Sequence, residues 1–363
     1  MRRFAAFWLA ALAAFIGFLF VFRTILLPFV AGMAIAYALD PLAGWLTRHG
    51  IKRIWAATLL LVFLLIFFVA LVLVVGPLLI LQLLQLSEDI PDYIGEAQQA
   101  FGLVIESDFA AYIGLDELSI GESLRNFFGN GGQVVGTFIT SLWSGGQALA
   151  AILSFLVVTP FVAFYLLSDW PRMISWIDGL LPRRYASEVR LVARRIDVKI
   201  ARFVRGQLLV GLILGVFYAT GLVFIGLDFG LLIGLVAGFV SFVPYLGFAV
   251  GFFLSMIVSV AQFYPDLLMP AITLGLFFVG QFIESYVLYP RLLGRQVGMH
   301  PVWLFFSLFA FGLLFGFVGL LIAVPAASAV GVVFGYAIER YRDSELYSGE
   351  VNRKGPAAQT ADE

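Results

Sequence analysis

Long apolar runs separated by short charged segments cover most of this 363-residue chain. A bilayer core about 30 Å thick takes about 20 apolar residues in a helix, and most of the runs approach or exceed that length. The runs are Phe4–Phe22, Thr24–Leu39, Trp55–Leu86, Gln147–Leu167, Gly206–Leu227, 229–265, Leu267–Tyr289 and 301–338. The pattern predicts an all-α polytopic membrane protein with about eight membrane-spanning or re-entrant helical segments.

Two of these runs contain no charged residue and are too long for one crossing, yet barely long enough for two. They are 229–265 and 301–338, and both contain the motif Gly-x4-Val-Pro, once from Gly238 to Pro244 and once from Gly319 to Pro325. Glycine and proline interrupt helices, and interrupted backbone at membrane depth occurs where it is buried in protein or lines a cavity. We therefore expect two broken hairpins that enter the membrane from opposite sides, as in the repeats of secondary transporters.

Composition narrows the class of protein further. Hydrophobic residues make up 62% of the chain and charged residues 12%, against roughly 45–50% and about 25% in soluble domains. The chain has no cysteine and only two histidines, His49 and His300. It also lacks the phosphate-binding loop of ATP-driven pumps and the metalloprotease and serine-hydrolase motifs. No enzymatic activity, metal or cofactor is expected.

The positive charges separate the two sides of the membrane. Of the 22 Lys and Arg, 20 lie in the N-terminus, 40–54, 169–205, 290–300 and the tail from 339, which leaves Arg23 and Arg125 elsewhere. The positive-inside rule places all five segments in the cytoplasm, together with both termini. We expect N-terminal transmembrane helices over residues 1–86, an acidic extracytoplasmic domain over 87–145 and a transmembrane helix over 146–168. These are followed by a cytoplasmic basic amphipathic helix over 169–205, a transport core over 206–338 and a cytoplasmic tail over 339–363.

The basic segment before the core has helical periodicity. Its apolar positions recur at intervals of three and four residues, at Val189, Val192, Ile196, Ile200 and Phe203. A helix with such an apolar face and basic residues around it is typical of the headgroup layer of anionic lipid. A gating role is the alternative. Nucleic-acid binding is not expected, because few aromatic residues interleave with the basic ones.

Glu284 stands out because it is a carboxylate inside an apolar run, six residues before Pro290. A charge at that depth costs several kcal/mol unless it is protonated, paired or hydrated, so such residues are functional candidates. Gln281, three residues earlier, should share its helix face. The alternative is a structural ion pair between Glu284 and Arg291.

Five segments resemble the AI-2E (autoinducer-2 exporter-like) family of bacterial membrane proteins. They are V-P-Y-L-G at 243–247, Q-F-I-E at 281–284, L-G-R-Q-V-G-M-H-P at 293–301, F-G-F-V-G-L-L-I-A-V-P at 315–325, and L-P-F-V-A-G-M-A-I-A-Y-A-L-D-P at 27–41. The resemblance implies transport in the bacterial inner membrane, of a small polar solute or signal such as autoinducer-2 or of a monovalent cation. It also implies a homo-oligomer, with a pentamer and an elevator-like transport core expected.

The sequence therefore predicts a secondary transporter coupled to an ion gradient. The alternatives are a sodium/proton antiporter and, in another class, a membrane scaffold or receptor without flux. The glycines of the candidate pathway would allow close backbone approach, the prolines would free carbonyl groups, and the two polar side chains would supply ligands or a proton. The candidate residues are Gly238, Pro244, Gly247, Gln281, Glu284, Gly316, Gly319 and Pro325.

Overall fold

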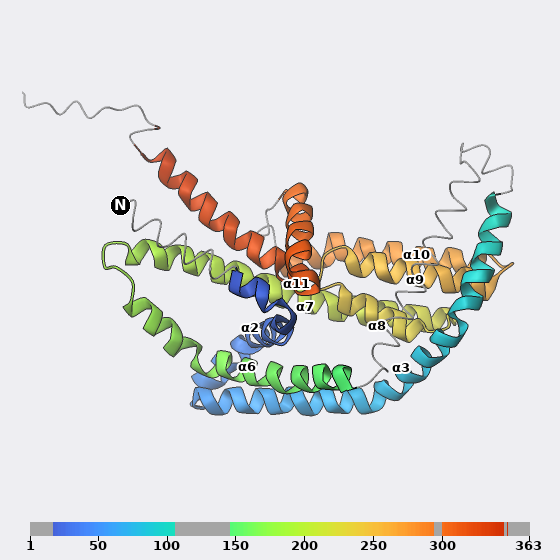
Figure 1. Cartoon of the computed structure of the whole chain (residues 1–363), viewed down its shortest axis with the longest axis horizontal. Helices are drawn as coiled ribbons and strands as arrows, with labels where there is room; N and C mark the ends of the chain where they lie inside the picture. The colour runs from blue at the N-terminus through green and yellow to red at the C-terminus, as the bar shows by residue number, and fades with distance from the viewer. Residues whose placement is uncertain (1–16, 106–145, 294–299, 345–346, 348–363) are drawn as a thin grey trace, which may run out of the picture.

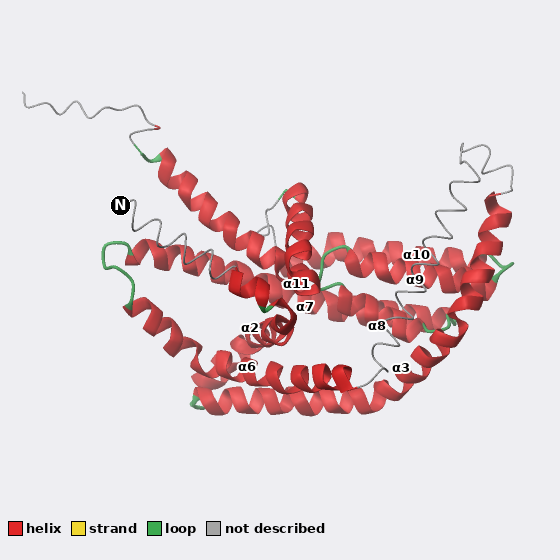
Figure 2. Ribbon diagram, viewed as in Figure 1, coloured by secondary structure: helices red, strands yellow, loops and turns green. Residues whose placement is uncertain are grey.

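The computed structural model describes residues 17–105, 146–293, 300–344 and 347. All regular structure in that part of the chain is helical, and it contains no strand (Figure 2). Within it, seven helices are long and apolar enough to cross a membrane, and α8 is a shorter apolar helix. The structure confirms the expected all-α polytopic membrane protein.

Three long helices form the N-terminal part of the described chain. After a short 3-10 turn, η1 (Arg23–Ile25), they are α2 (Leu26–Arg48), α3 (Arg53–Ile105) and α6 (Gly146–Gly179). They meet at Ala43, Ala57 and Leu167, which are almost completely buried. Two of these three residues are alanines, and small side chains let membrane helices approach closely. Most of the run Phe4–Phe22 and most of the acidic segment 87–145 lie outside the described residues.

The remaining helices surround α7, which lies at the centre of the molecule (Figure 1). α7 spans Ala186–Ile225. The helices around it are α8 (Gly230–Val240), α9 (Leu246–Phe263), α10 (Leu268–Phe282), the π-helix η2 (Ile283–Leu293) and α11 (Pro301–Arg342). One stripe of α7, at Val210, Leu214, Tyr218 and Leu222, is 0% exposed. This spacing of four residues keeps a single helix face in the core.

The connecting turns lie at opposite ends of the long axis of the molecule (Figure 1). The α2–α3 turn at 49–52 and the α6–α7 turn at 180–185 are at one end, and the turns at 226–229 and 264–267 are at the other. The turn at 226–229 begins with Gly226 in the left-handed conformation (φ 78°), as is common after a helix. The side chain of Gln262 holds this turn by accepting from the Asp228 amide and donating to the Gly226 carbonyl.

Three of the expected domain boundaries fall inside continuous helices. α3 passes residue 86, α6 passes residue 168, and α7 passes residue 205 without interruption. The basic segment is therefore the first half of a 40-residue helix, about 60 Å long at about 1.5 Å per residue. The basic residues therefore lie on a helix that continues into the apolar run from Gly206, and not on a separate one. The division into domains otherwise stays a prediction.

The first broken hairpin is present. α8 ends at Val240, residues 241–245 form turns, and α9 starts at Leu246. Tyr245, which precedes α9, is in the left-handed region with φ 67°. Pro244 lies in this break and is buried. The prediction of an interruption at the first Gly-x4-Val-Pro motif is confirmed.

The second broken hairpin is also present, but its break lies elsewhere. The backbone turns at Gly316 (φ 62°, ψ −139°), and the two limbs of α11 diverge from that point (Figure 1). A Cβ on Gly319 would lie 1.8 Å from the Phe311 carbonyl oxygen, so the limbs fold closely onto each other beside the turn. Pro325, by contrast, lies inside the second helical limb. The two copies of the motif therefore do not mark equivalent breaks, because in the second one a glycine with positive φ makes the turn.

Candidate functional site

Glu284 lies at the start of the π-helix and is 3% exposed. The buried residues of this segment are Glu284, Leu288 and Leu293, at intervals of four and five residues. These intervals match the i→i+5 hydrogen bonding of a π-helix better than the 3.6-residue repeat of an α-helix. The segment also contains Pro290, which has no backbone N–H to donate and so removes one i→i−4 hydrogen bond from an α-helix. The π conformation thus sets which side chains face the core.

Two tyrosines lie near the Glu284 carboxylate, and Gln207 joins the cluster through one of them. The Tyr289 hydroxyl lies beside both Glu284 and Gln207, and Tyr218 is near enough to feel the charge of the carboxylate. Residues five apart share a face in a π-helix, whereas in an α-helix they would be about 140° apart. The π-helix therefore brings Tyr289 to Glu284.

This cluster contains unused hydrogen-bonding capacity. The Tyr218 hydroxyl, the Tyr289 hydroxyl and the Gln207 Oε1 atom are buried and make no well-formed hydrogen bond within the described part of the chain. Glu284 forms no ion pair there either, and Arg291, its expected structural partner, is exposed. Buried polar groups are normally satisfied, so a cluster of unsatisfied ones around a carboxylate suits a site for a polar ligand, an ion or water.

The first hairpin break joins the cluster through Gln207. This residue of α7 is 0% exposed, and its Nε2 atom donates to the carbonyl oxygen of Ser241, the first residue of the break. Ser241 in turn donates from Oγ to the Ala237 carbonyl at 2.7 Å. The Ser241 carbonyl, which has no helical partner where α8 ends, thus belongs to the same buried network as Glu284.

Two of the expected glycines hold the break against its neighbours. A Cβ on Gly238 would lie 2.2 Å from Gly215 Cα, and one on Gly247 would lie 2.0 Å from Ser241 Oγ. Real Cβ atoms essentially never come within 3.0 Å of such atoms. Glycine is required at both positions because the backbones themselves are in contact.

The two hairpins meet beside this break. Val243 forms a buried cluster with Leu308 and Ala323, which belong to the two limbs of α11. The ring of Tyr245 stacks on that of Phe305 with centroids 5.5 Å apart. The expected approach of the two hairpins is therefore present in the structure.

The other expected site residues lie apart from the carboxylate cluster. Gln281 does not share the buried face of Glu284, because its Nε2 atom donates to Ser285 Oγ at 3.0 Å on the exposed side. Gly316 is exposed and makes the turn of α11, whereas Gly319 is buried against the first limb. Pro325 is half-buried next to Val324, a residue of the main core cluster.

Sequence reasoning missed Gln207, Tyr218 and Tyr289. The signal for Gln207 was available, since it is an amide at the start of the apolar run Gly206–Leu227. The signal for the tyrosines was not, because a tyrosine in an apolar run does not reveal which neighbour its hydroxyl faces.

A separate polar network ties α7 to the N-terminal helices. Arg53 bonds Asp40 at 2.7 Å and donates from Nε to the Leu167 carbonyl at 2.8 Å. Arg205 donates to the Tyr37 carbonyl at 2.7 Å and lies 3.8 Å from Asp40. The network therefore joins α2, α3, α6 and α7.

Comparison with known proteins shows that this chain is similar to transporters. The family model described as "AI-2E family transporter" matches residues 9–339. The chain is 29% identical over 321 residues to YrrI of Bacillus subtilis, which is named as a transport protein, and the match covers 87% of each chain. It is 27% identical over 335 residues to PerM of Escherichia coli K12, which is named as a permease, with 90% of this chain and 91% of PerM covered.

Proposed function

Because this chain belongs to the AI-2E family of transporters, we propose that it is a secondary transporter of the bacterial inner membrane whose transport site includes Glu284. Its cargo in this proposal is a small polar solute or signal such as autoinducer-2, and movement is coupled to an ion gradient. The observation that carries the proposal is a buried carboxylate without an ion pair in the described residues, next to a broken helix.

The surroundings of Glu284 suit reversible binding. Gln207 and Tyr289 offer an amide oxygen and a hydroxyl without well-formed hydrogen bonds among the described residues, and these groups can accept from or donate to a polar cargo. The adjoining helix break and the glycine contacts of Gly238 allow backbone groups to approach a ligand. These features support a site at the junction of α7, η2 and the α8–α9 break.

The proposed orientation has both termini in the cytoplasm. The basic turns at 49–52 and 180–185 share one end of the molecule, and the turns at 226–229 and 264–267, which contain no basic residue, share the other (Figure 1). This arrangement supports the positive-inside assignment. In the proposal the chain works as a homo-oligomer whose core, 206–338, moves between the two faces.

Sodium/proton antiport is the second candidate in the same class. A carboxylate with hydroxyl and amide oxygens beside it provides the oxygen ligands that a hard cation prefers. A scaffold or receptor without flux would not need a buried carboxylate inside a span. Burying a carboxylate there costs free energy, and such residues are usually kept for a function.

The test uses the purified protein in proteoliposomes with an imposed pH gradient, with and without sodium, and with labelled autoinducer-2 as the probe solute. Glu284→Gln keeps size and hydrogen bonding but cannot exchange a proton. It should lose dependence on the pH gradient, whereas Asp169→Asn, which removes an exposed carboxylate, should keep it. A Glu284→Gln protein with the wild-type pH profile would make Glu284 a packing residue. Sodium-driven proton movement without solute flux would select antiport.

A further inference from the structure

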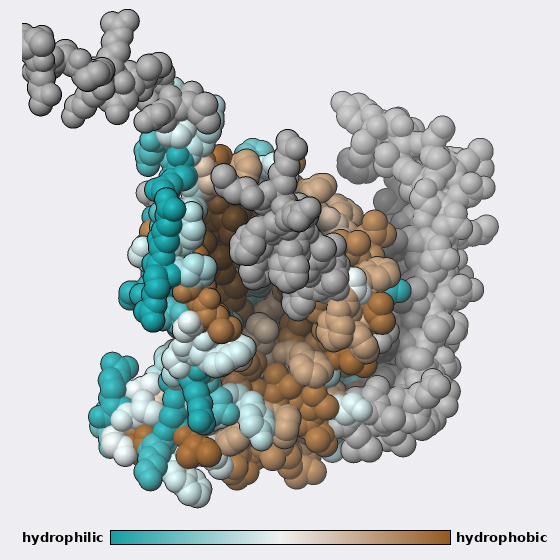
Figure 3. All heavy atoms as spheres, turned by 60° about the vertical axis from the view of Figure 1, so that its left-hand side comes forward, coloured by the Kyte–Doolittle hydropathy of each residue, from teal (hydrophilic) through white to brown (hydrophobic). Residues whose placement is uncertain are grey.

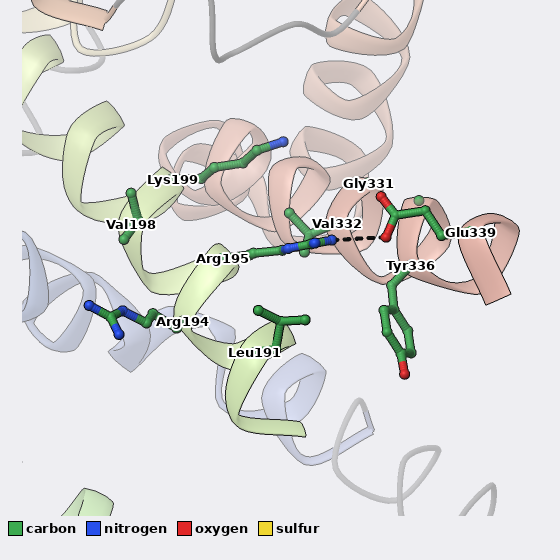
Figure 4. A pocket seen from close by; sticks show the side chains of 10 residues that line it. Leu191, Arg194, Arg195, Val198, Lys199, Gly331, Val332, Tyr336 and Glu339 are labelled. Atoms are coloured by element: carbon green, nitrogen blue, oxygen red, sulfur yellow. Dashed lines mark hydrogen bonds and ion pairs between the residues drawn. The ribbon is translucent and has the colours of Figure 1, made fainter. Parts of the chain in front are cut away.

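A groove of about 450 Å³ separates the first half of α7 from the last part of α11. It is lined on α7 by Leu191, Arg194, Arg195, Val198 and Lys199, and on α11 by Gly331, Val332, Gly335, Tyr336 and Glu339. Both sets of residues follow helical spacing, so the groove lies between two facing helix sides (Figure 4). On the face shown in Figure 3, hydrophilic residues gather along one edge beside a hollowed apolar surface.

The charge of the groove is positive and only partly neutralised. Its lining contains three basic residues and one acid, Glu339, which Arg195 engages at 3.1 Å. Lys199 is half-buried, extends toward α11 in Figure 4, and forms no ion pair with any described residue. Arg194 points away from α11 in the same view. One cation is therefore available inside the groove.

The opposite wall, on α11, contains two glycines. Gly331 and Gly335 are spaced as in a Gly-x3-Gly motif, which usually lets a second helix pack closely. A Cβ built on either glycine meets nothing within 4 Å. No described helix occupies this face, so an extended apolar chain can lie along it.

The groove reaches the lipid headgroup layer when the apolar run from Gly206 is placed at the edge of the bilayer core. Lys199 precedes the apolar run that starts at Gly206 by two turns of helix, about 10 Å. The polar layer adds about 5–8 Å on each side of the bilayer core, and a lysine side chain spans the remaining distance. On α11 the glycines belong to the apolar stretch that ends before Glu339.

We propose that this groove binds one anionic phospholipid, with its phosphate on Lys199 and Arg195 and an acyl chain along the glycine face of α11. Such a lipid would fill the space between α7 and α11 and add to the ion pairs that already join them, Arg195 to Glu339 and Arg340 to Glu188 at 3.3 Å. The proposal does not depend on the identity of the transported solute.

Native mass spectrometry of the purified protein tests the proposal by comparing retention of phosphatidylglycerol and phosphatidylcholine. The wild type should retain the anionic lipid preferentially. Lys199→Gln should weaken that retention about fivefold, since one cation near an anionic headgroup is worth about 1 kcal/mol. Arg183→Gln removes the same charge from the α6–α7 turn outside the groove and should have no effect.

A second pair of variants tests the apolar wall. Gly331→Leu should fill the groove and abolish retention, while Gly275→Leu, at another glycine with open space around its Cβ position, should not. Equal losses in Lys199→Gln and Arg183→Gln would reduce the effect to diffuse surface charge and overturn the proposal. Displacement of the lipid by inorganic phosphate would assign the groove to a soluble anion. Loss of the oligomer in Gly331→Leu with lipid retention unchanged would assign the glycine face to a second copy of the chain.

Discussion

The contact between Gly238 and Gly215 offers a direct test of how α8 packs on α7. A Cβ on Gly238 would lie 2.2 Å from Gly215 Cα, 2.6 Å from Gly215 N and 2.7 Å from the Gly211 carbonyl oxygen. Ordinary contact requires 3.4–4 Å, so Gly238→Ala must separate two helix backbones by about 1.2–1.8 Å at this point. All three nearest atoms are backbone atoms, and no side chain can rotate away to relieve the clash.

Two glycines provide matched comparisons for this substitution. Gly275→Ala in α10 meets nothing within 4 Å, and Gly215→Ala approaches Gly238 Cα at 3.3 Å, which a small adjustment can relieve. Replacing glycine by alanine favours the helix by about 1 kcal/mol in every case. The differences in stability among the three variants therefore report the cost of packing the added Cβ. Overpacking costs about 1–3 kcal/mol. We expect stability to rank Gly275→Ala above Gly215→Ala, and Gly215→Ala above Gly238→Ala.

Thermal unfolding of the purified proteins in detergent measures this ranking. The melting temperature of Gly238→Ala should fall several degrees below that of Gly275→Ala, and flux should fall with it because α8 ends at the proposed site. A Gly238→Ala protein that melts as high as Gly275→Ala would refute the backbone contact between α7 and α8.

Three further predictions follow from other parts of the fold. Gly316→Ala should destabilise the protein by about 1–3 kcal/mol in the same thermal assay, because its positive φ is strained for any L side chain although space for a Cβ is open; a neutral effect would contradict the turn at this residue. Cysteines at Arg184 and Asp266, in a chain without its own cysteine, should react with an impermeant maleimide from opposite sides, and labelling of both from one side would contradict the topology. Asp40→Asn should lower the melting temperature more than Asp169→Asn does, because Asp40 lies between two arginines of different helices; equal effects would show that the network contributes little.

The helical class, the two interrupted hairpins and Glu284 could be read from the sequence. Each depends on a local property: the length of an apolar run, the absence of charge within it, or a carboxylate where charge is costly. The resemblance to the AI-2E family rested on short motifs that are contiguous in the chain, and it is confirmed by the family match.

The internal geometry of the site could not be read in the same way. Gln281 was expected beside Glu284 because an α-helix puts i and i+3 on one face, but the segment becomes a π-helix at Ile283 and brings Tyr289 there instead. The second break was expected at the motif from Gly319 to Pro325, since proline and glycine both interrupt helices. The turn falls at Gly316, and Pro325 remains inside a helix.

The sequence by itself determined which segments are long and apolar enough to enter a membrane, and it predicts which loops share a side, because apolar burial and the placement of basic residues act on each segment separately. Only the tertiary structure decided which polar groups meet. Gln207 on α7, Ser241 at the α8–α9 break and Glu284 on η2 are separated by tens of residues. The chain of contacts from Ser241 through Gln207 and Tyr289 to Glu284 depends on how closely glycine-bearing helices approach. That approach is a property of pairs of helices, and no single apolar run contains it.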